Sequence, residues 1–268
     1  MRHTLFGLEH QLRQIAWDAG AVVMGIYEEQ RVNNVRLANK LDASPLTRAD
    51  IASHQLIVGR LAHLQPTIPV VSEEDEQSFV QASTVGSYWL IDPLDGTKEF
   101  LACSGEFTIN IALIVDTEPV WGVVYAPALD KMFWGGRDYG SYRKHDENIE
   151  AIRVAAPVGP GASYRVVASK SHLTLETSAF IDQLGSTELV QAGSSLKFCT
   201  IAEGRADVYP RLAPTCQWDT AAAQAVLEGA GGHVYDTSGN RISYGKKDVL
   251  NPSFIAASVF LNELHRAE

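Results

Sequence analysis

One segment of the sequence, residues 88–100, constrains the fold and the chemistry of this chain more than any other. Its first four residues, Tyr-Trp-Leu-Ile, form an apolar run that predicts a buried strand. We expect the strand to end at Asp92, because Pro93 has no amide hydrogen to give to a neighbouring strand. Asp95 follows three residues after Asp92, and Thr97 follows two residues later. The segment therefore predicts a strand end that presents two carboxylates and a hydroxyl within one tight turn.

A dense set of oxygen donors at one strand end favours a magnesium site. The side chains of Asp92 and Asp95, with the Leu94 carbonyl between them, are hard ligands of the kind that Mg²⁺ prefers. The alternative is a simple turn, in which an aspartate caps a helix and the Pro-Leu pair packs against the core. Two further acidic motifs in the sequence favour the metal site over the simple turn.

A second predicted strand also ends in carboxylates. The apolar run at residues 68–71 leads directly into Ser-Glu-Glu-Asp-Glu at residues 72–76, which contains Glu73. Such acidic runs are usually solvated loops. If this strand lies beside the strand at residues 88–91, however, both acidic ends meet at one edge of the sheet, where binding sites tend to form.

The third acidic motif opens a helix in the second half of the chain. Asp219 stands in Trp-Asp-Thr-Ala-Ala, residues 218–222, at a place where it is a good N-cap, and capping alone could explain it. Facing Glu73, Asp92 and Asp95 across a cleft, it would complete a group of four carboxylates. Like charges this close repel, and divalent cations relieve the repulsion while creating a reaction site.

The two halves of the chain carry different patterns. Residues 4–29 have apolar residues at helical spacing and predict an amphipathic helix, and the strands that follow predict an antiparallel sheet. After a Pro- and Gly-rich linker at residues 156–162, strands alternate with helices and predict an α/β layer. We therefore expect an N-terminal α+β subdomain at residues 1–157, which carries the metal-binding loops, and a C-terminal α/β subdomain at residues 158–268, which completes the metal site.

Composition narrows the class of function. The 268 residues carry a net charge of −10, which argues against binding to a nucleic-acid polymer, because backbone phosphates attract a basic face. Three widely spaced cysteines give no paired zinc or disulfide pattern and fit a reducing compartment. The first residues lack the apolar core of a signal peptide, and no run of about eighteen apolar residues predicts a membrane span. We expect a cytoplasmic protein without a transmembrane segment.

In order and spacing, the three acidic motifs resemble those of the inositol monophosphatase superfamily of Mg²⁺-dependent, lithium-sensitive phosphatases. The motifs concerned are Ser72–Asp75, Trp89–Thr97 and Trp218–Ala222, and the resemblance extends over nearly the whole chain. It implies a layered α/β/α/β/α sandwich of two subdomains. Three further stretches are similar to the bacterial 3′(2′),5′-bisphosphate nucleotidases of the CysQ type, namely Asp95–Phe100, Gly193–Cys199 and Val208–Arg211.

The nucleotidase resemblance implies the hydrolysis of 3′-phosphoadenosine 5′-phosphate (PAP), a small-molecule nucleotide bisphosphate, to AMP and phosphate. It also implies two or more Mg²⁺ ions per active site and a role in clearing a by-product of sulfate assimilation. No cysteine or histidine lies in the key motifs, so we expect direct attack by a metal-activated water and no phosphoenzyme. Some relatives associate with the inner face of the membrane, which leaves peripheral attachment open here. The choice between monomer and homodimer also stays open.

The same resemblance assigns roles to individual residues. The metal ligands are Glu73, Asp92, the Leu94 carbonyl, Asp95 and Asp219. Glu73 and Thr97 orient the attacking water. Asp50 either assists a further metal or water, or caps a helix through its capping-box spacing to Thr47. Lys98 either contacts the phosphate or pairs with a loop acid. Gly96 and Thr97 are expected to donate hydrogen bonds to the phosphate, and the substrate-binding residues at the metal site are Glu73, Leu94, Asp95, Gly96, Thr97 and Asp219.

Substrate choice is assigned to residues of the second half. Lys197 and Arg211 match the nucleotidase motifs and are expected to contact the second phosphate, the one that is not cleaved. The alternative is that both form ordinary surface ion pairs. Gly193 and Ser194 precede a helix, where backbone amides can bind an anion. His172 either contacts the nucleotide or is an ordinary loop histidine.

Two other functions stay open at this point. The first is an inositol or sugar phosphate monoesterase that uses the same metal site. Lys197 and Arg211 argue against it, because a substrate with two phosphates needs extra cations and inositol phosphate does not. The second is a non-catalytic regulator that senses metal or nucleotide. The intact set of catalytic positions argues against that function.

Overall fold

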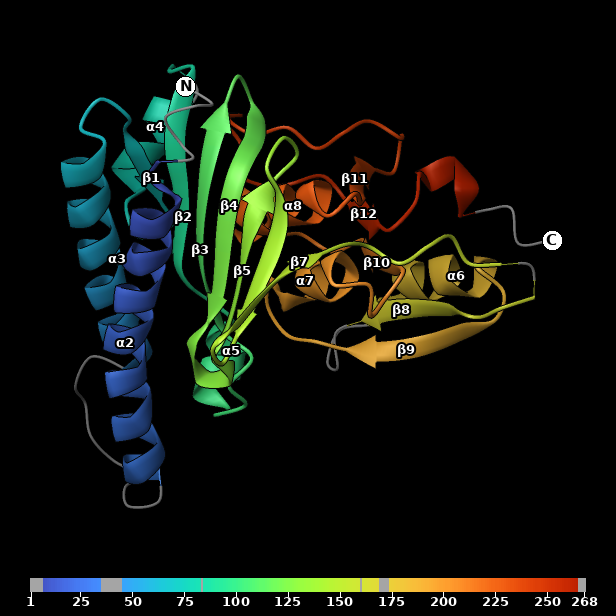
Figure 1. Cartoon of the computed structure of the whole chain (residues 1–268), viewed down its shortest axis with the longest axis horizontal. Coiled ribbons are helices and arrows are strands. Elements are labelled where there is room, and N and C mark those ends of the chain that lie inside the picture. The colour runs from blue at the N-terminus through green and yellow to red at the C-terminus, as the bar shows by residue number, and fades with distance from the viewer. Residues whose placement is uncertain (1–6, 35–44, 83, 160, 169–173, 265–268) are drawn as a thin grey trace.

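The first half of the chain folds into a seven-stranded sheet whose strand order follows the sequence (Figure 1). The structure is a computed structural model that describes residues 7–34, 45–82, 84–159, 161–168 and 174–264. The strands are β1 (Val70–Ser72), β2 (Ser87–Asp95), β3 (Thr108–Val115), β4 (Glu118–Ala126), β5 (Lys131–Gly136), β6 (Gly140–His145) and β7 (Asn148–Ile152). β1 and β2 are parallel, and each later neighbouring pair is antiparallel. The predicted antiparallel sheet is therefore present, and the two acidic strands are neighbours.

Strand β2 is longer than the sequence predicts. It continues through Pro93 to residue 95, so the expectation that it ends at Asp92 is wrong. Proline is tolerated there because β1 has already ended: the last pair between β1 and β2 is Ser72 with Ile91. Beyond that pair, no strand on the β1 side needs an amide hydrogen. The pairing with β3 shifts between residues 92 and 95, which marks a bulge. The acidic turn is therefore a bulged strand.

Two long helices cover one face of this sheet. α2 spans Glu9–Asn34 and α3 spans Pro45–Leu64, and the predicted amphipathic helix is present from Glu9 onward. The short elements are η1 (Glu76–Ser78), α4 (Phe79–Ala82), α5 (Thr97–Leu101), η2 (Pro127–Leu129) and η3 (Leu261–Glu263). Within the described ranges, no helix combines the length and apolar character that crossing a membrane requires.

The second half forms a five-stranded sheet with order β11-β12-β10-β8-β9. Its strands are β8 (Tyr164–Ala168), β9 (Thr187–Gln191), β10 (Val208–Arg211), β11 (His233–Asp236) and β12 (Phe254–Ala257). Its helices are α6 (Leu175–Gln183), α7 (Leu196–Ala202) and α8 (Gln217–Gly229). β8 is parallel to β9 and β10, whereas β12 is antiparallel to β10 and β11. The predicted alternation of strands and helices is present.

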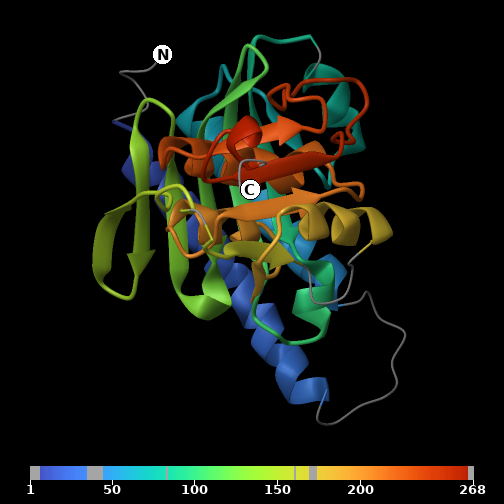
Figure 2. The same ribbon diagram turned by 90° about the vertical axis from the view of Figure 1, so that its right-hand side faces the viewer.

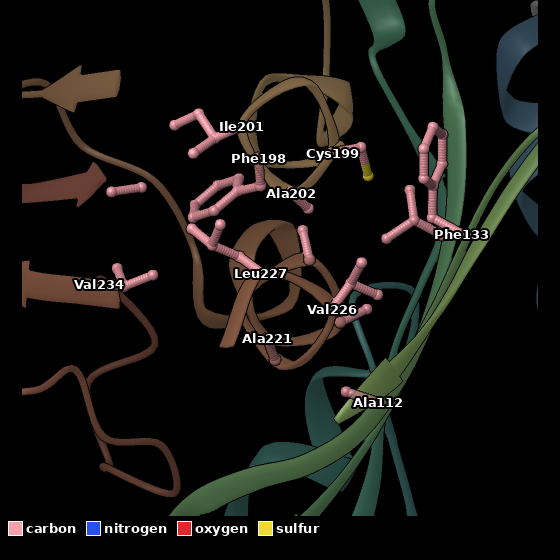
Figure 3. Packing of buried hydrophobic residues seen from close by; sticks show 14 of the residues in the cluster. Ala112, Phe133, Phe198, Cys199, Ile201, Ala202, Ala221, Val226, Leu227 and Val234 are labelled. Carbon is pink, nitrogen blue, oxygen red and sulfur yellow. The ribbon is translucent and has the colours of Figure 1, made fainter. Parts of the chain in front are cut away.

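Three apolar cores stack these elements into five layers. The first core joins α2 and α3 to one face of the seven-stranded sheet. The second joins the opposite face of that sheet to α7, α8 and the five-stranded sheet, and Figure 3 shows its side chains around α7 and α8. The third joins the far face of the five-stranded sheet to α6. Figure 2 looks from the side of the second sheet, with α2 behind it. The fold is therefore the α/β/α/β/α sandwich that the resemblance implied.

Helix α8 lies very close to the first sheet. A Cβ atom added at Gly122 of β4 would lie 2.4 Å from the carbonyl oxygen of Ala222 in α8. Only a glycine on the strand and a small residue on the helix allow this approach. The approach fixes the first turn of α8, which carries Asp219, above the face of the sheet that β2 shares.

Candidate active site

The bulge in β2 aims its carboxylates at α8. Tyr88 and Leu90 belong to the core on the α8 side of the sheet. Because side chains alternate along a strand, Asp92 faces the same way. The Leu94 amide donates to Asp92 Oδ1 at 3.0 Å, so the bulge closes on its own carboxylate. Asp92 is only 1% exposed.

Asp219 meets these carboxylates from the start of α8. Cys216 is the N-cap of the helix, and Asp219 is its third residue, so the expected N-cap role of Asp219 is wrong. Asp219 instead takes the reciprocal place in a capping box, where its Oδ2 accepts from the Cys216 amide at 2.8 Å. One carboxylate oxygen from each of Asp92, Asp95 and Asp219 lies within 4.8 Å of the others. The fold thus brings together three acids that are distant in sequence.

Glu73 joins this cluster from the end of β1. Its amide donates to the Ile91 carbonyl at 3.3 Å, so the chain beyond β1 still follows β2 towards the bulge. The carboxyl groups of Glu73 and Asp92 lie close enough to influence each other, and the charge of Glu73 is one of the causes that raise the pKa of Asp92.

Proximity and burial disfavour the ionised form of these acids. Burial raises the pKa of Asp92 well above its usual value, and the charges of Glu73, Asp95 and Asp219 raise it further. Burial and the charge of Asp95 raise the pKa of Asp219 to about 7. Glu73 is an exposed residue, but its carboxyl group is largely shielded from water. This shielding is the largest cause that raises the pKa of Glu73. Several carboxylates that cannot all ionise at neutral pH suit the binding of cations.

The donor set fits hard divalent cations. The converging side chains offer carboxylate oxygens, and the part of the chain that the structure describes adds no histidine or thiolate to this group of ligands. Oxygen-only donors suit Mg²⁺, Mn²⁺ or Ca²⁺ better than softer metals. Asp92, Asp95 and Asp219 are the residues placed to hold such ions, with Glu73 beside them.

Asp95 is held by residues that had no predicted role towards it: Ser194 was predicted to contact the substrate, and the others were given no role in the site. Its Oδ2 atom accepts from the Ser195 amide at 2.8 Å and from the hydroxyls of Ser195 and Ser194. Asn110 Nδ2 donates to Ser195 Oγ at 2.9 Å, and Thr108 Oγ1 donates to Asp95 Oδ2 at 3.4 Å. One oxygen of Asp95 is therefore fixed by the protein, while Oδ1 accepts none of these bonds. The sequence signal that could have indicated these contacts is the presence of the polar residues Thr108 and Asn110 in the otherwise apolar strand at 108–115.

Helix α3 is tied to both acidic loops. Asp50 lies inside the helix, which begins at Pro45, so the Thr47–Asp50 capping box is not what starts it. Burial, then the charges of Glu74 and Glu73, raise the pKa of Asp50 to about 7. Ser53 Oγ donates to the Pro93 carbonyl at 2.8 Å, and His54 Nδ1 lies 2.8 Å from Ser72 Oγ. Sequence reasoning missed Ser53 and His54, because nothing in a helical pattern marks such contacts.

Lys197 and Arg211 lie in the same pocket as two of the acids. This pocket, of about 90 Å³, is lined by Asp95, Ser194, Lys197, Phe198, Tyr209, Arg211, Thr215, Asp219, Thr220 and Phe254. Lys197 is 8% exposed, and its Nζ donates to the Ser194 carbonyl at 3.1 Å. Burial lowers the pKa of Lys197, and the neighbouring charge of Asp95 opposes that change. Arg211 Nη2 donates to the Pro214 carbonyl at 3.1 Å, and its buried Nε has no partner within the described residues. Among the residues that the structure describes, neither cation forms the surface ion pair that was the alternative.

The remaining predicted contacts have mixed placements. Gly96 has φ 99° and precedes α5, which begins at the exposed Thr97. Ser194 has φ 50°, a conformation that non-glycine residues rarely adopt. A Cβ added at Gly193 would lie 2.8 Å from Glu106 Cβ, so packing alone requires glycine there. Lys98 is exposed directly after the loop. His172 lies outside the described residues.

Comparisons with known proteins agree with this geometry. Residues 8–267 match the profile of the inositol monophosphatase family. A protein of Salmonella typhimurium named 3′(2′),5′-bisphosphate nucleotidase CysQ is 43% identical over 245 residues, which cover 91% of this chain and 97% of the relative. The protein of the same name from Escherichia coli K12 is 42% identical, with 91% and 97% covered.

Solved structures give the same result for the fold. The crystal structure of CysQ from Bacteroides thetaiotaomicron has a TM-score of 0.78 and 38% identity, with 91% of this chain and 95% of that chain covered. An inositol monophosphatase from Anabaena has a TM-score of 0.73 at 23% identity, with 100% and 96% covered, and supports the fold alone.

Proposed function

Because this chain belongs to the inositol monophosphatase family, we propose that it is a divalent-metal-dependent phosphatase that hydrolyses PAP to AMP and phosphate. The observation that carries the proposal is the pocket in which Lys197 and Arg211 lie beside Asp95 and Asp219. An acidic metal cluster suits any phosphate monoester. Two extra cations beside it suit a substrate with a second phosphate, and relatives at 42–43% identity carry the name bisphosphate nucleotidase.

The acidic cluster is proposed to hold two or more Mg²⁺ ions. The ligands would be Asp92, Asp95, Asp219 and Glu73, with the Leu94 carbonyl on the bulge between the first two. Bound divalent ions would neutralise the phosphoryl charge and lower the pKa of the attacking water. The four hydroxyl and amide donors on Asp95 Oδ2 would keep that side chain in one orientation during the reaction.

The chain's own residues would orient the water and the phosphate. Glu73 lies beside Asp92 and would accept a hydrogen bond from the water, together with the hydroxyl of Thr97. The backbone at Gly96 and Thr97, at the start of α5, would donate to the phosphate that is cleaved. Asp50 faces the charges of Glu73 and Glu74 and would assist a further metal or water. Hydrolysis then proceeds in one displacement, with inversion at phosphorus.

The second phosphate would bind at Lys197 and Arg211. Because Lys197 is buried, little water screens its charge, and its interaction with a phosphate is strengthened. The Ser194 carbonyl fixes the position of its ammonium group. Ser194 lines this pocket and Gly193 precedes it in the chain, while Lys98 and His172 stay as proposed substrate contacts. Residues 158–268 would thus form the subdomain that binds nucleotide, and residues 1–157 the subdomain with the metal loops. We also propose that the enzyme acts in the cytoplasm, as a monomer or homodimer, in sulfate assimilation.

Two substrates and one substitution test the proposal. Phosphate release from PAP and from inositol 1-phosphate is measured for the wild type and for Lys197→Gln, with Arg205→Gln as a control on the surface. We expect the wild type to prefer PAP. Lys197→Gln should raise KM for PAP about tenfold or more and leave kcat/KM for inositol 1-phosphate unchanged, because only PAP carries the second phosphate. A wild type that prefers inositol 1-phosphate would instead identify a monoesterase, and equal losses on both substrates would remove Lys197 from substrate recognition.

A further inference from the structure

A second pocket lies on the face of the first sheet that carries α2. Its volume is about 220 Å³. Residues from α2, β5 and β6 line it: His10, Arg13, Gln14, Trp17, Met132 and Lys144. Three of these side chains are basic and none is acidic. In a chain with a net charge of −10, such a group is unexpected on electrostatic grounds alone.

Aromatic rings hold two of the cations in place. The guanidinium carbon of Arg13 lies 4.4 Å from the centroid of the Trp134 ring, and Lys144 Nζ lies 4.8 Å from that of Trp17. Trp17 in turn stacks on Tyr125 at 5.3 Å. A cation–π contact orients a positive charge without neutralising it, as a carboxylate would. The two charges are therefore pre-ordered and still able to bind an anion.

These two cations have fewer acid partners than other basic residues: Arg13 has one ion pair within its own helix, and Lys144 has none among the described residues. Arg165 pairs with Asp207 at 2.6 Å, for example, and Arg241 pairs with Glu228 at 2.5 Å. Arg13 pairs with Glu9 one turn earlier on α2, where the contact joins Nε to a carboxylate oxygen at 3.3 Å. Across the described ranges, no carboxylate pairs with Lys144.

The sheet separates this pocket from the catalytic cluster. Met132 and Trp134 belong to the core on the α2 side. Asp92 lies two residues after Leu90 on β2, so its side chain points to the opposite face of the sheet, towards α8. A ligand in the α2 pocket therefore cannot contact the catalytic acids or Lys197, and the two sites can be tested independently.

We propose that the α2 pocket binds a tetrahedral oxyanion of the phosphate or sulfate class, held by Arg13 and Lys144. The forked guanidinium suits two oxygens of such an anion, and the ammonium suits a third. His10 and Gln14 also line the pocket and carry further hydrogen-bond donors, although the Gln14 amide nitrogen already donates to Asp18 Oδ1 at 2.8 Å. The anion is either a free ion or the phosphate of a lipid headgroup at a membrane surface, and the two sources share this chemistry.

The indole of Trp17 reports binding directly. Trp17 is 37% exposed, whereas Trp89, Trp121, Trp134 and Trp218 are at most 6% exposed. The Mg²⁺-loaded, full-length protein labelled with ¹⁵N is titrated with sodium sulfate at constant ionic strength, balanced with chloride, and Trp17→Phe assigns the resonance. We expect the Trp17 indole signal to move along a saturable curve with sulfate. Movement that chloride reproduces at equal ionic strength would overturn the proposal.

Substitutions show which side chains bind the ion. Lys144→Gln and Arg13→Gln should each weaken sulfate binding about tenfold or more, because each removes a charge-assisted hydrogen bond. Arg13→Lys keeps the charge and should keep most of the affinity. Arg31→Gln on the same helix and Lys131→Gln on β5 should leave it unchanged. PAP hydrolysis should stay at the wild-type rate in all five variants, so this result is independent of the proposed function. Unchanged sulfate affinity in Lys144→Gln and Arg13→Gln would overturn the site.

Vesicles separate the two sources of the anion. The wild type and Lys144→Gln are sedimented with phosphatidylcholine vesicles that contain phosphatidic acid. Sedimentation of the wild type that Lys144→Gln abolishes would support the site and identify a lipid phosphate as its ligand. Saturable sulfate binding without sedimentation would support the site for a free ion. Sedimentation that is equal in both proteins, together with no saturable sulfate binding, would count against it.

Discussion

Replacing Asp219 by asparagine should stabilise the metal-free protein while destroying its activity. Burial and the charge of Asp95 raise the pKa of Asp219 to about 7, from a usual value near 3.8. The folded state therefore holds this proton more tightly than the unfolded state does, and stability falls as pH rises from about 4 to about 7. Asparagine carries no charge and keeps an acceptor for the Cys216 amide, so the penalty disappears.

The size of the effect follows from the geometry. Two unit charges 4.8 Å apart repel by roughly 3.5 kcal/mol at an effective dielectric constant of about 20. A pKa rise of about three units corresponds to at most about 4 kcal/mol. Residue 219 is partly exposed, and asparagine interacts less well with the helix dipole, so we expect a net gain of about 1–2 kcal/mol above pH 7. For a chain of this size, that is a rise in Tm of about 3–6 °C.

Thermal unfolding in EDTA measures the expected gain in stability of the metal-free variant, and thermal unfolding in Mg²⁺ measures its expected loss of stabilisation by the metal. In EDTA at pH 8, Asp219→Asn should melt above the wild type, and the difference should vanish near pH 4. With Mg²⁺ at about a hundred times its Kd, binding should stabilise the wild type by about 2.7 kcal/mol, and the variant should gain much less. Asp236→Asn is the matched control. There the hydrogen bonds from Asn240 and Ser238 outweigh the effect of burial and lower the pKa of Asp236, so this substitution should destabilise. A metal-free Asp219→Asn that melts below the wild type at pH 8 would refute the electrostatic reasoning.

Three further outcomes follow from the same contacts. Ser195→Ala removes a hydroxyl donor from Asp95 and should cost about 10–100-fold in activity at low Mg²⁺, partly recovered at high Mg²⁺; a loss that Mg²⁺ concentration does not affect would argue against a positioning role. Gly122→Ala places a Cβ 2.4 Å from the Ala222 carbonyl oxygen and should lower the free energy of unfolding by about 1–3 kcal/mol in denaturant titrations. Gly25→Ala, in open space on α2, should be neutral or stabilising, and equal losses in the two variants would contradict the packing argument. EDTA should abolish phosphate release from PAP, and added Mg²⁺ should restore it; full activity in EDTA would rule out metal-dependent hydrolysis.

Much of the fold could be predicted because its patterns are local. Hairpins such as β3–β4 follow from short turns between apolar runs, and the alternation after residue 163 follows from strand and helix periodicity. The start of α8 was misplaced by three residues, because Asp219 suits both the N-cap and the third position of a helix. The continuation of β2 through Pro93 depended on where β1 ends, which is a property of the neighbouring strand.

The acidic part of the site could also be predicted, because three motifs share one chemistry and two of them follow neighbouring strands at one edge of the sheet. The residues that orient those acids could not. Ser195 reaches Asp95 across 100 positions in the sequence, and Ser53 reaches Pro93 across 40. Such contacts arise from how α3 and the loop before α7 pack on β2. No sequence pattern around a serine indicates which distant residue it will contact. The pocket beside α2 escaped notice for the same reason, since Arg13 and Lys144 meet only in the folded chain.

Anomalous diffraction from crystals grown with Mn²⁺ tests the central claim most directly. Mn²⁺ accepts the same oxygen ligands as Mg²⁺ and scatters strongly enough to be located by itself. We predict two or more anomalous peaks bonded to carboxylate oxygens of Asp92, Asp95 and Asp219, with Glu73 on one of them. Mn²⁺ that supports PAP hydrolysis but binds away from these four side chains would contradict the account.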